Sequence, residues 1–227
     1  MGYLQNLWNA LDLSLLGDLL MRVAAVLLCL VVHETCHGLA AYAMGDPTAK
    51  RMHRLSLNPL HHIDWFGLAA MLVAGFGWAK PVPVDMRYFK NPKRGMALSA
   101  LAGPVSNFIL TVVLLFAMRF LEVFVPATAV TLWIYEFFLT AALLSVGLGL
   151  FNLLPIPPLD GSKVLFSLMS DEQYRTLMRY ERYGMMILLL LVASGLLGRP
   201  LSSATQYLLN KLFFLAESGY QLSLRLF

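Results

Sequence analysis

Long apolar runs dominate this 227-residue chain and limit the folds open to it. Apolar residues make up 59% of the sequence and charged residues only 13%, whereas a soluble domain is about half apolar and a quarter charged. A helix needs about 20 residues to cross a bilayer, and four runs approach or exceed that length, at residues 20–44, 97–118, 131–154 and 184–198. The sequence therefore predicts an all-α polytopic membrane protein, a bundle of about four to six transmembrane helices in a single membrane-embedded domain over residues 1–227.

The basic residues lie where the apolar runs end, and they indicate the sidedness of the chain. Of the 17 Lys and Arg residues, most lie between Gly45 and Met96 or between residues 156 and 183. By the positive-inside rule both segments are cytoplasmic, so the first long helix runs inward, the second outward and the third inward. No basic cluster is interleaved with stacking aromatic residues, so the net charge of +4 does not indicate a nucleic-acid partner.

Three further segments have features of their own. The run at residues 66–77 is short and glycine-rich and has basic flanks, which favours a re-entrant or interfacial element. The stretch GWAKPVPV at 77–84 holds two prolines and predicts an extended edge beside that element. The first 20 residues lack the basic start of a secretory signal peptide. We expect them to form an amphipathic lead-in helix or the first part of a span.

The first long run carries the sequence HETCH near its middle. On a helix His33 and His37 are four residues apart and share a face, so their imidazoles can bind one zinc ion. Glu34 beside them can take a proton from an attacking water. An unpaired carboxylate at the centre of a span costs about 2.5 to 3.5 kcal/mol on insertion scales and normally marks a function. Two alternatives are hydrogen bonding between helices and a closed structural site that includes the thiolates of Cys29 and Cys36.

Two histidines leave a catalytic zinc one ligand short, because such sites take three protein ligands and a water. The sequence NLLPIPPLDG offers Asp160 after three prolines that forbid regular helix, so we expect extended backbone that holds this carboxylate in place. The alternative is a simple Asp-Gly turn. Asn152 in the same motif, and Asn107 after a Gly-Pro pair that we expect to begin a helix, can each donate to a developing oxyanion or hold a substrate strand. Either can equally bond a neighbouring helix.

In this order along the chain, HETCH, LAGPVSN and NLLPIPPLDG closely resemble the motifs of the site-2 protease family of intramembrane zinc metalloproteases. The stretches LSLNPLHHIDWFG and GFGWAKPVPV resemble loop motifs of its compact bacterial and archaeal branch, which lacks PDZ and CBS domains. The resemblance extends from Val31 to Val164. It implies a catalytic core over about residues 20–165, with a re-entrant segment near the substrate path, and C-terminal helices over about residues 184–227.

The resemblance also implies the site and its chemistry. A single zinc ion would be held by His33, His37 and Asp160, with Glu34 as the catalytic base and Asn152 and Asn107 near the scissile peptide. The chain would then be a zinc metalloendopeptidase of a prokaryotic cell membrane. It would hydrolyse a transmembrane helical protein or peptide within the lipid bilayer, in regulated proteolysis or in the clearance of signal peptides.

A rival interpretation is a zinc-binding membrane protein without peptidase activity, such as a transporter or an assembly factor. A transporter should place its ligands along a path or pair discontinuous helices, and this chain shows a single cluster. The predicted topology also sets the depth of the site. His33 and His37 lie in the inner half of an inward-running helix, and Asp160 lies just beyond the inner end of another. We therefore expect the zinc in the cytoplasmic leaflet.

Overall fold

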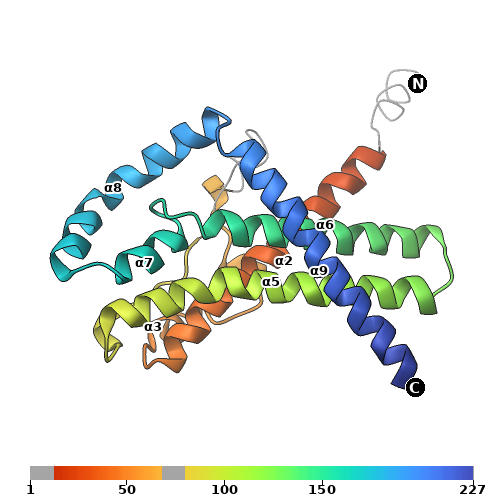
Figure 1. The fold of residues 1–227 in the computed structure, drawn as a ribbon, viewed down its shortest axis with the longest axis horizontal. Helices are drawn as coiled ribbons and strands as arrows, with labels where there is room; N and C mark the ends of the chain where they lie inside the picture. Colours follow the sequence, from red (N-terminus) through yellow and green to blue (C-terminus); the bar gives the residue numbers. More distant parts are fainter. Residues whose placement is uncertain (1–12, 68–79, 227) are drawn as a thin grey trace, which may run out of the picture.

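The computed structural model describes residues 13–67 and 80–226 (Figure 1). Two short 3-10 turns lie at Pro59–His61 and Met86–Tyr88. The α-helices are α2 (Leu13–Ala43), α3 (Thr48–Arg51), α5 (Pro92–Phe124), α6 (Ala129–Asn152), α7 (Asp160–Ser167), α8 (Asp171–Ala193) and α9 (Gly198–Leu226). The described part of the chain contains no β-strand, so the predicted all-α class is confirmed.

Three helices, α2, α5 and α6, are long and apolar enough to cross a membrane. A fourth span is added if α8 and α9, which meet at an 85° bend, are counted as one broken span. The protein is therefore a multi-pass membrane protein, and among the described residues the number of spans reaches the lower end of the predicted range only when this bent pair is counted. The predicted element at residues 66–77 falls almost wholly outside the described residues.

Helices α2, α5 and α6 pack around one apolar core. Helices α5 and α6 run side by side in opposite directions, α2 crosses them, and α9 lies obliquely over both (Figure 1). Leu115 and Met118 of α5 and Val146 of α6 are completely buried at the centre. Leu209 and Ala216 of α9 join the same core, and they fix the C-terminal helix against the bundle.

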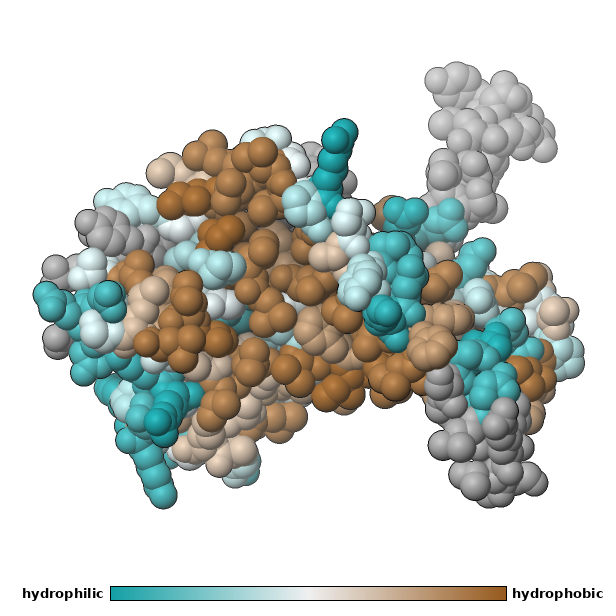
Figure 2. All heavy atoms as spheres, viewed as in Figure 1, coloured by the Kyte–Doolittle hydropathy of each residue, from teal (hydrophilic) through white to brown (hydrophobic). Residues whose placement is uncertain are grey.

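The outside of the bundle is apolar as well. Figure 2 shows a broad hydrophobic face over the middle of the molecule, with hydrophilic residues gathered toward its two ends. Exposed side chains on this outer surface include Ile109 of α5 and Leu132 of α6. Such a surface suits lipid, because helices satisfy their own backbone hydrogen bonds and expose only apolar side chains to the hydrocarbon.

Helix α5 begins earlier than its apolar run, and this corrects the predicted start at Gly103-Pro104. Asn91 caps the helix by accepting a hydrogen bond from the Arg94 N–H at 3.1 Å, and Pro92 occupies the first turn, where a missing N–H costs nothing. Pro104 lies inside the helix instead. Transmembrane helices tolerate interior proline because neighbouring groups can satisfy the freed carbonyl.

The two basic segments lie at the same end of the bundle. Helix α3, the start of α5 and α7 gather on one side in Figure 1, while the connection between α5 and α6 lies at the opposite end. This arrangement is what the predicted sidedness requires.

Candidate active site

Three side chains from two distant parts of the sequence meet between α2 and α7. The Nε2 atoms of His33 and His37 each lie 3.1 Å from Oδ2 of Asp160. All three residues are buried, and their ligand atoms lie within 4.8 Å of one another. The structure thus brings together the three residues that the sequence predicts as metal ligands.

Asp160 reaches this position through a sharp change in local structure. Residues 153–159 form a succession of turns rather than the expected extended backbone, and Asp160 is the first residue of α7. Gly161 allows this approach, because a Cβ there would lie 2.6 Å from the carbonyl oxygen of Leu154. The end of α6 and the start of α7 can therefore fold tightly enough to aim the carboxylate at the histidines.

The charge state of Asp160 follows from its neighbours. Burial raises the pKa of this carboxyl, but hydrogen bonds from His33 and His37 lower it by more, and the Lys163 ammonium lowers it further. The pKa of Asp160 therefore lies below its usual range. The Lys163 Nζ is 3.7 Å from Asp160 Oδ1, so the carboxylate has cationic or N–H groups on both of its oxygens.

Gly103 of α5 makes room for the two imidazoles. A Cβ at this position would lie 2.5 Å from the His37 Nε2 and 2.7 Å from the His33 Cε1, closer than atoms can pack. The absent side chain lets α5 press against the histidine face of α2. The rings then lie edge to face with their centroids 4.5 Å apart.

These residues fit a zinc ion by the chemistry of their donor atoms. Two imidazole nitrogens and one carboxylate oxygen form the set that catalytic zinc sites use, with a position left for water. His37 is already oriented for this role, because its Nδ1 lies 2.7 Å from the carbonyl oxygen of Ser99. A carbonyl only accepts, so Nδ1 carries a proton and Nε2 is the nitrogen left to bind a metal.

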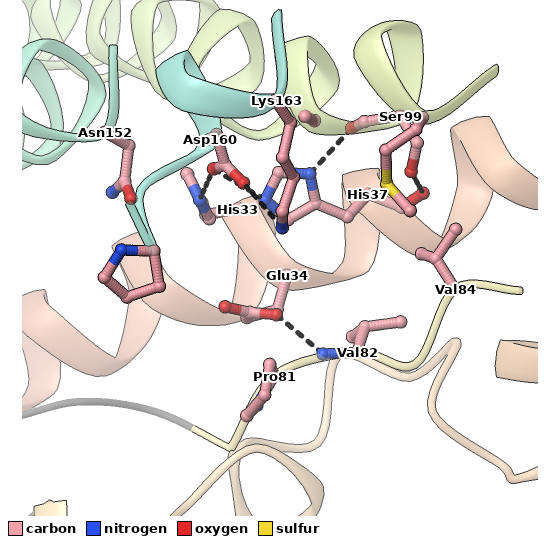
Figure 3. Close-up of a pocket in the computed structure, with 13 residues that line it drawn as sticks. His33, Glu34, His37, Pro81, Val82, Val84, Ser99, Asn152, Asp160 and Lys163 are labelled. Atoms are coloured by element: carbon pink, nitrogen blue, oxygen red, sulfur yellow. Dashed lines mark hydrogen bonds and ion pairs between the residues drawn. The ribbon is translucent and has the colours of Figure 1, made fainter. Parts of the chain in front are cut away.

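Glu34 lies across a pocket from Asp160, on the side of the extended segment at residues 80–84 (Figure 3). Its Oε2 accepts a hydrogen bond of 2.9 Å from the Val82 N–H. The pocket has a volume of about 250 Å³. The residues that line it are His33, Glu34, His37, Pro81, Val82, Val84, Met96, Ser99, Ala100, Asn152, Pro158, Asp160 and Lys163.

The two asparagines occupy different environments. Asn152 lines the pocket, and one of its amide hydrogens is donated to the carbonyl of Leu148 at 3.0 Å. Asn107 is not among the lining residues; it is completely buried in α5, with its Nδ2 3.1 Å from the His33 Nδ1. Of the two, the structure therefore places only Asn152 where it can reach a substrate.

The cysteines lie apart from the cluster. The Cys29 thiol donates to the carbonyl of Ala141 on α6 at 3.4 Å, and Cys36 is half-buried on α2. Within the described ranges, the group of His, Cys, Asp and Glu residues able to hold a metal consists of His33, His37 and Asp160.

Sequence reasoning named Asn107 but missed Ser99, the spacing role of Gly103 and Lys163, and a spacing signal could have found them. Ser99, Gly103, Asn107 and Thr111 follow one another at intervals of four on α5, and all are buried. A stripe of small and polar residues at this spacing is typical of a close contact between membrane helices. Lys163 lies one turn after Asp160 on α7, so helical periodicity places it beside the same pocket.

Sequence comparisons identify relatives of this chain among known proteins. The profile of peptidase family M50 matches residues 120–195. Over 176 residues the chain is 39% identical to "Putative zinc metalloprotease YwhC" of Bacillus subtilis (strain 168), which covers 77% of this chain and 80% of that protein. It is 32% identical over 200 residues to "Putative zinc metalloprotease Rip2" of Mycolicibacterium smegmatis, covering 85% of this chain and 75% of the relative.

A third relative, "Zinc metalloprotease MJ0392" of Methanocaldococcus jannaschii, is 34% identical over 83 residues, or 37% of this chain and 22% of that protein. No solved structure matches the chain. With the resemblance to YwhC extending over most of both proteins, the chain belongs to peptidase family M50, the site-2 protease family, and is a zinc metalloendopeptidase of the membrane.

Proposed function

We propose that this protein is an intramembrane endopeptidase that hydrolyses a peptide bond in or near the transmembrane segment of another membrane protein. The observation that carries the proposal is the position of the site. His33, Glu34 and His37 lie within α2, a helix apolar enough to span the bilayer, and they line one pocket with Asp160. A substrate that reaches this pocket has to arrive from the lipid or from its boundary.

We assign the roles of the site residues from their contacts. His33, His37 and Asp160 are the zinc ligands, and Glu34 is the general base. A bound zinc ion supplies Lewis-acid polarisation of the peptide carbonyl and lowers the pKa of a water. Glu34 accepts a proton from the attacking water and passes it to the leaving amine. Asn152 has a second amide hydrogen to donate, and it lies in the pocket where a substrate carbonyl would need one.

The extended segment at residues 80–84 provides a surface for the substrate backbone. Pro81, Val82 and Val84 line the pocket opposite Asp160. The segment is braced from behind by Arg54, which donates to the carbonyl of Lys80 at 2.6 Å. A helical substrate hides its scissile carbonyl in its own hydrogen bonds, so it must unwind locally and can then lie along this segment as an added strand.

The cellular role follows from sidedness. With the basic segments in the cytoplasm, the pocket faces the cytoplasmic leaflet of a prokaryotic cell membrane. Regulated intramembrane proteolysis and the clearance of signal peptides are the two cellular roles that we propose for a cut at this depth.

The decisive test replaces Glu34 by Gln in the purified full-length protein in detergent, with a helical transmembrane substrate. We expect cleavage to fall by about a hundredfold to ten-thousandfold, the usual contribution of a general base, while the zinc content stays that of the unmodified protein. Glu136→Gln makes the same chemical change at an exposed position of α6 and should leave both quantities unchanged.

Two outcomes would contradict the proposal. Undiminished cleavage by Glu34→Gln would show that another group is the base. A zinc-loaded, unmodified protein that cuts no membrane-embedded substrate would favour the rival class, a zinc-binding membrane protein without intramembrane peptidase activity.

A further inference from the structure

The two histidines of the site are oriented by different kinds of partner. The Nδ1 of His37 faces the carbonyl of Ser99 at 2.7 Å (Figure 3). Because that oxygen can only accept, the proton of His37 is fixed on Nδ1. The Nδ1 of His33 instead faces the side-chain amide of Asn107. An amide carries a donor and an acceptor of similar size, so it can present either one to the ring.

Asn107 is held firmly behind His33. Its side chain is completely buried. Its backbone carbonyl accepts hydrogen bonds from Ser145 Oγ of α6 at 2.8 Å and from Thr111 Oγ1 at 2.9 Å. Both partners fix the α5 backbone at this point and leave the amide group aimed at the imidazole. Asn107 does not line the pocket, so it acts on the site through His33.

The present orientation of the amide leaves one polar atom without a partner. The Nδ2 of Asn107 lies 3.1 Å from the His33 Nδ1, while its Oδ1 is buried with no hydrogen-bond partner. In this arrangement the His33 Nδ1 is the acceptor, so the ring proton is on Nε2 and points at Asp160 Oδ2. A zinc ion needs the lone pair of that Nε2. A half-turn of the Asn107 amide exchanges its oxygen and nitrogen. Its Oδ1 then faces an Nδ1–H of His33, and the imidazole ring stays in place.

We propose that Asn107 is a positioning residue for the zinc ligand His33: in the zinc-loaded protein its Oδ1 accepts the His33 Nδ1–H and holds the ring with the Nε2 lone pair toward the metal. This inference rests on the zinc site of the proposed function. It replaces the role near the scissile peptide that the sequence suggested for Asn107. A hydrogen-bond acceptor behind a metal-binding histidine raises the basicity of the ligand nitrogen and fixes the orientation of the ring. Loss of such an acceptor typically weakens metal binding about 10- to 100-fold.

The test measures zinc affinity by competition with a chelating dye in the purified full-length protein. Asn107→Leu removes the acceptor and should weaken zinc binding about 10- to 100-fold. Asn107→Asp keeps an acceptor at the same place and should stay within a few-fold of the unmodified protein. Ser106→Ala removes a neighbouring buried hydroxyl that bonds only within α5, and it should leave zinc affinity unchanged.

A second measurement needs no variant that might fold poorly. In the unmodified, zinc-loaded protein labelled with ¹⁵N-histidine, nitrogen NMR should show the proton of His33 on Nδ1 and hydrogen-bonded. A zinc-loaded protein with the His33 proton absent from Nδ1 would overturn the inference. Asn107→Leu with undiminished zinc affinity, or Asn107→Asp as weak as Asn107→Leu, would overturn it as well.

His33→Ala separates failure of this inference from failure of the zinc site itself. If zinc binding is lost in His33→Ala but kept in Asn107→Leu, the site stands and the role of Asn107 is wrong. If both variants bind zinc as tightly as the unmodified protein, the assignment of His33 as a ligand is wrong, and the inference fails with it.

Discussion

Asp160 depends on its immediate neighbours more than the two histidines do. His33 and His37 are brought together by one helical turn of α2, whereas Asp160 is aimed at them by the turns at residues 153–159 and by the absence of a side chain at Gly161. Its two oxygens are then engaged by three groups, the imidazoles and Lys163. A carboxylate placed in this way is already ionised and directed before a metal arrives.

We expect Asp160→Ala to lower the zinc content of the purified protein without unfolding it, because the variant removes one ligand and leaves the helix packing intact. Elemental analysis gives the zinc content, and a thermal melt of the metal-free protein checks the fold. Asp18→Ala, at an exposed position of α2, serves as the control with full zinc. Full zinc in Asp160→Ala would contradict the assignment of Asp160 as a ligand and would reopen the alternative of a thiolate ligand from Cys29 or Cys36.

At the level of helices, the distance between α2 and α5 is set by the buried stripe on α5. Ser99 and its carbonyl hold His37, the Ser99 hydroxyl donates to the His37 carbonyl at 3.1 Å, and Gly103 makes room for both rings. Small residues let two membrane helices approach closely. Here the close approach also brings the partners of both histidines to their Nδ1 atoms.

A methyl group at Gly103 should therefore disrupt the metal site. We expect Gly103→Ala to force the imidazoles aside and to destabilise the zinc-loaded protein by about 1–3 kcal/mol, the usual cost of overpacking. Gly147→Ala in α6 is the matched control, since its Cβ would meet only Thr205 at 3.9 Å. Thermal melts with and without zinc measure both. A Gly103→Ala protein as stable and as well loaded as Gly147→Ala would contradict this account of the helix contact.

The sequence predicted the parts of the site that local geometry decides. His33, Glu34 and His37 share one helix, so their spacing alone predicts that they converge. The start of α5 was predicted wrongly because the cap at Asn91 and Pro92 outweighs the interior Pro104. The backbone before Asp160 was predicted extended, yet prolines also permit the turns that the structure shows.

The contacts between helices could not be predicted in the same way. That Asn107 faces the His33 ring rather than the pocket depends on how α5 is rotated against α2. This rotation depends on how the helices pack against one another, and the residue pattern of a single sequence does not predict it.

At the scale of the whole molecule, polarity separates the two ends of the bundle from its apolar middle. The basic segments lie at one end together with α3 and α7 (Figure 1), and the pocket is lined by Asp160 and Lys163 of α7. Helix α9 is tied across the bundle by an ion pair of 2.5 Å between Arg119 and Glu217. The site is thus part of a fixed set of helices. The orientation of these helices in the membrane would determine where along the substrate's span the cut falls.

We therefore expect cleavage in the inner half of the substrate's transmembrane segment. A pair of glycines placed there should speed cleavage, because an unwound backbone exposes its carbonyls. The same pair in the outer half should have little effect. Mass spectrometry of the new termini gives the position. Cuts clustered in the outer half would overturn the proposed sidedness, and equal rates for the two glycine placements would remove the unwinding argument.

The prolines of the segment at residues 80–84 also bear on self-association in a crowded membrane. An open strand edge ordinarily serves as a template for any other extended chain, including a second copy of the same protein. Here Pro81 and Pro83 have no N–H to donate, and the N–H groups of Lys80 and Val82 are already bonded within the chain. Two copies of the segment laid side by side could not exchange paired hydrogen bonds at these four residues, whereas an unwound substrate brings N–H groups of its own to the carbonyls of the segment. The edge can therefore stay open beside the pocket without joining one enzyme molecule to the next.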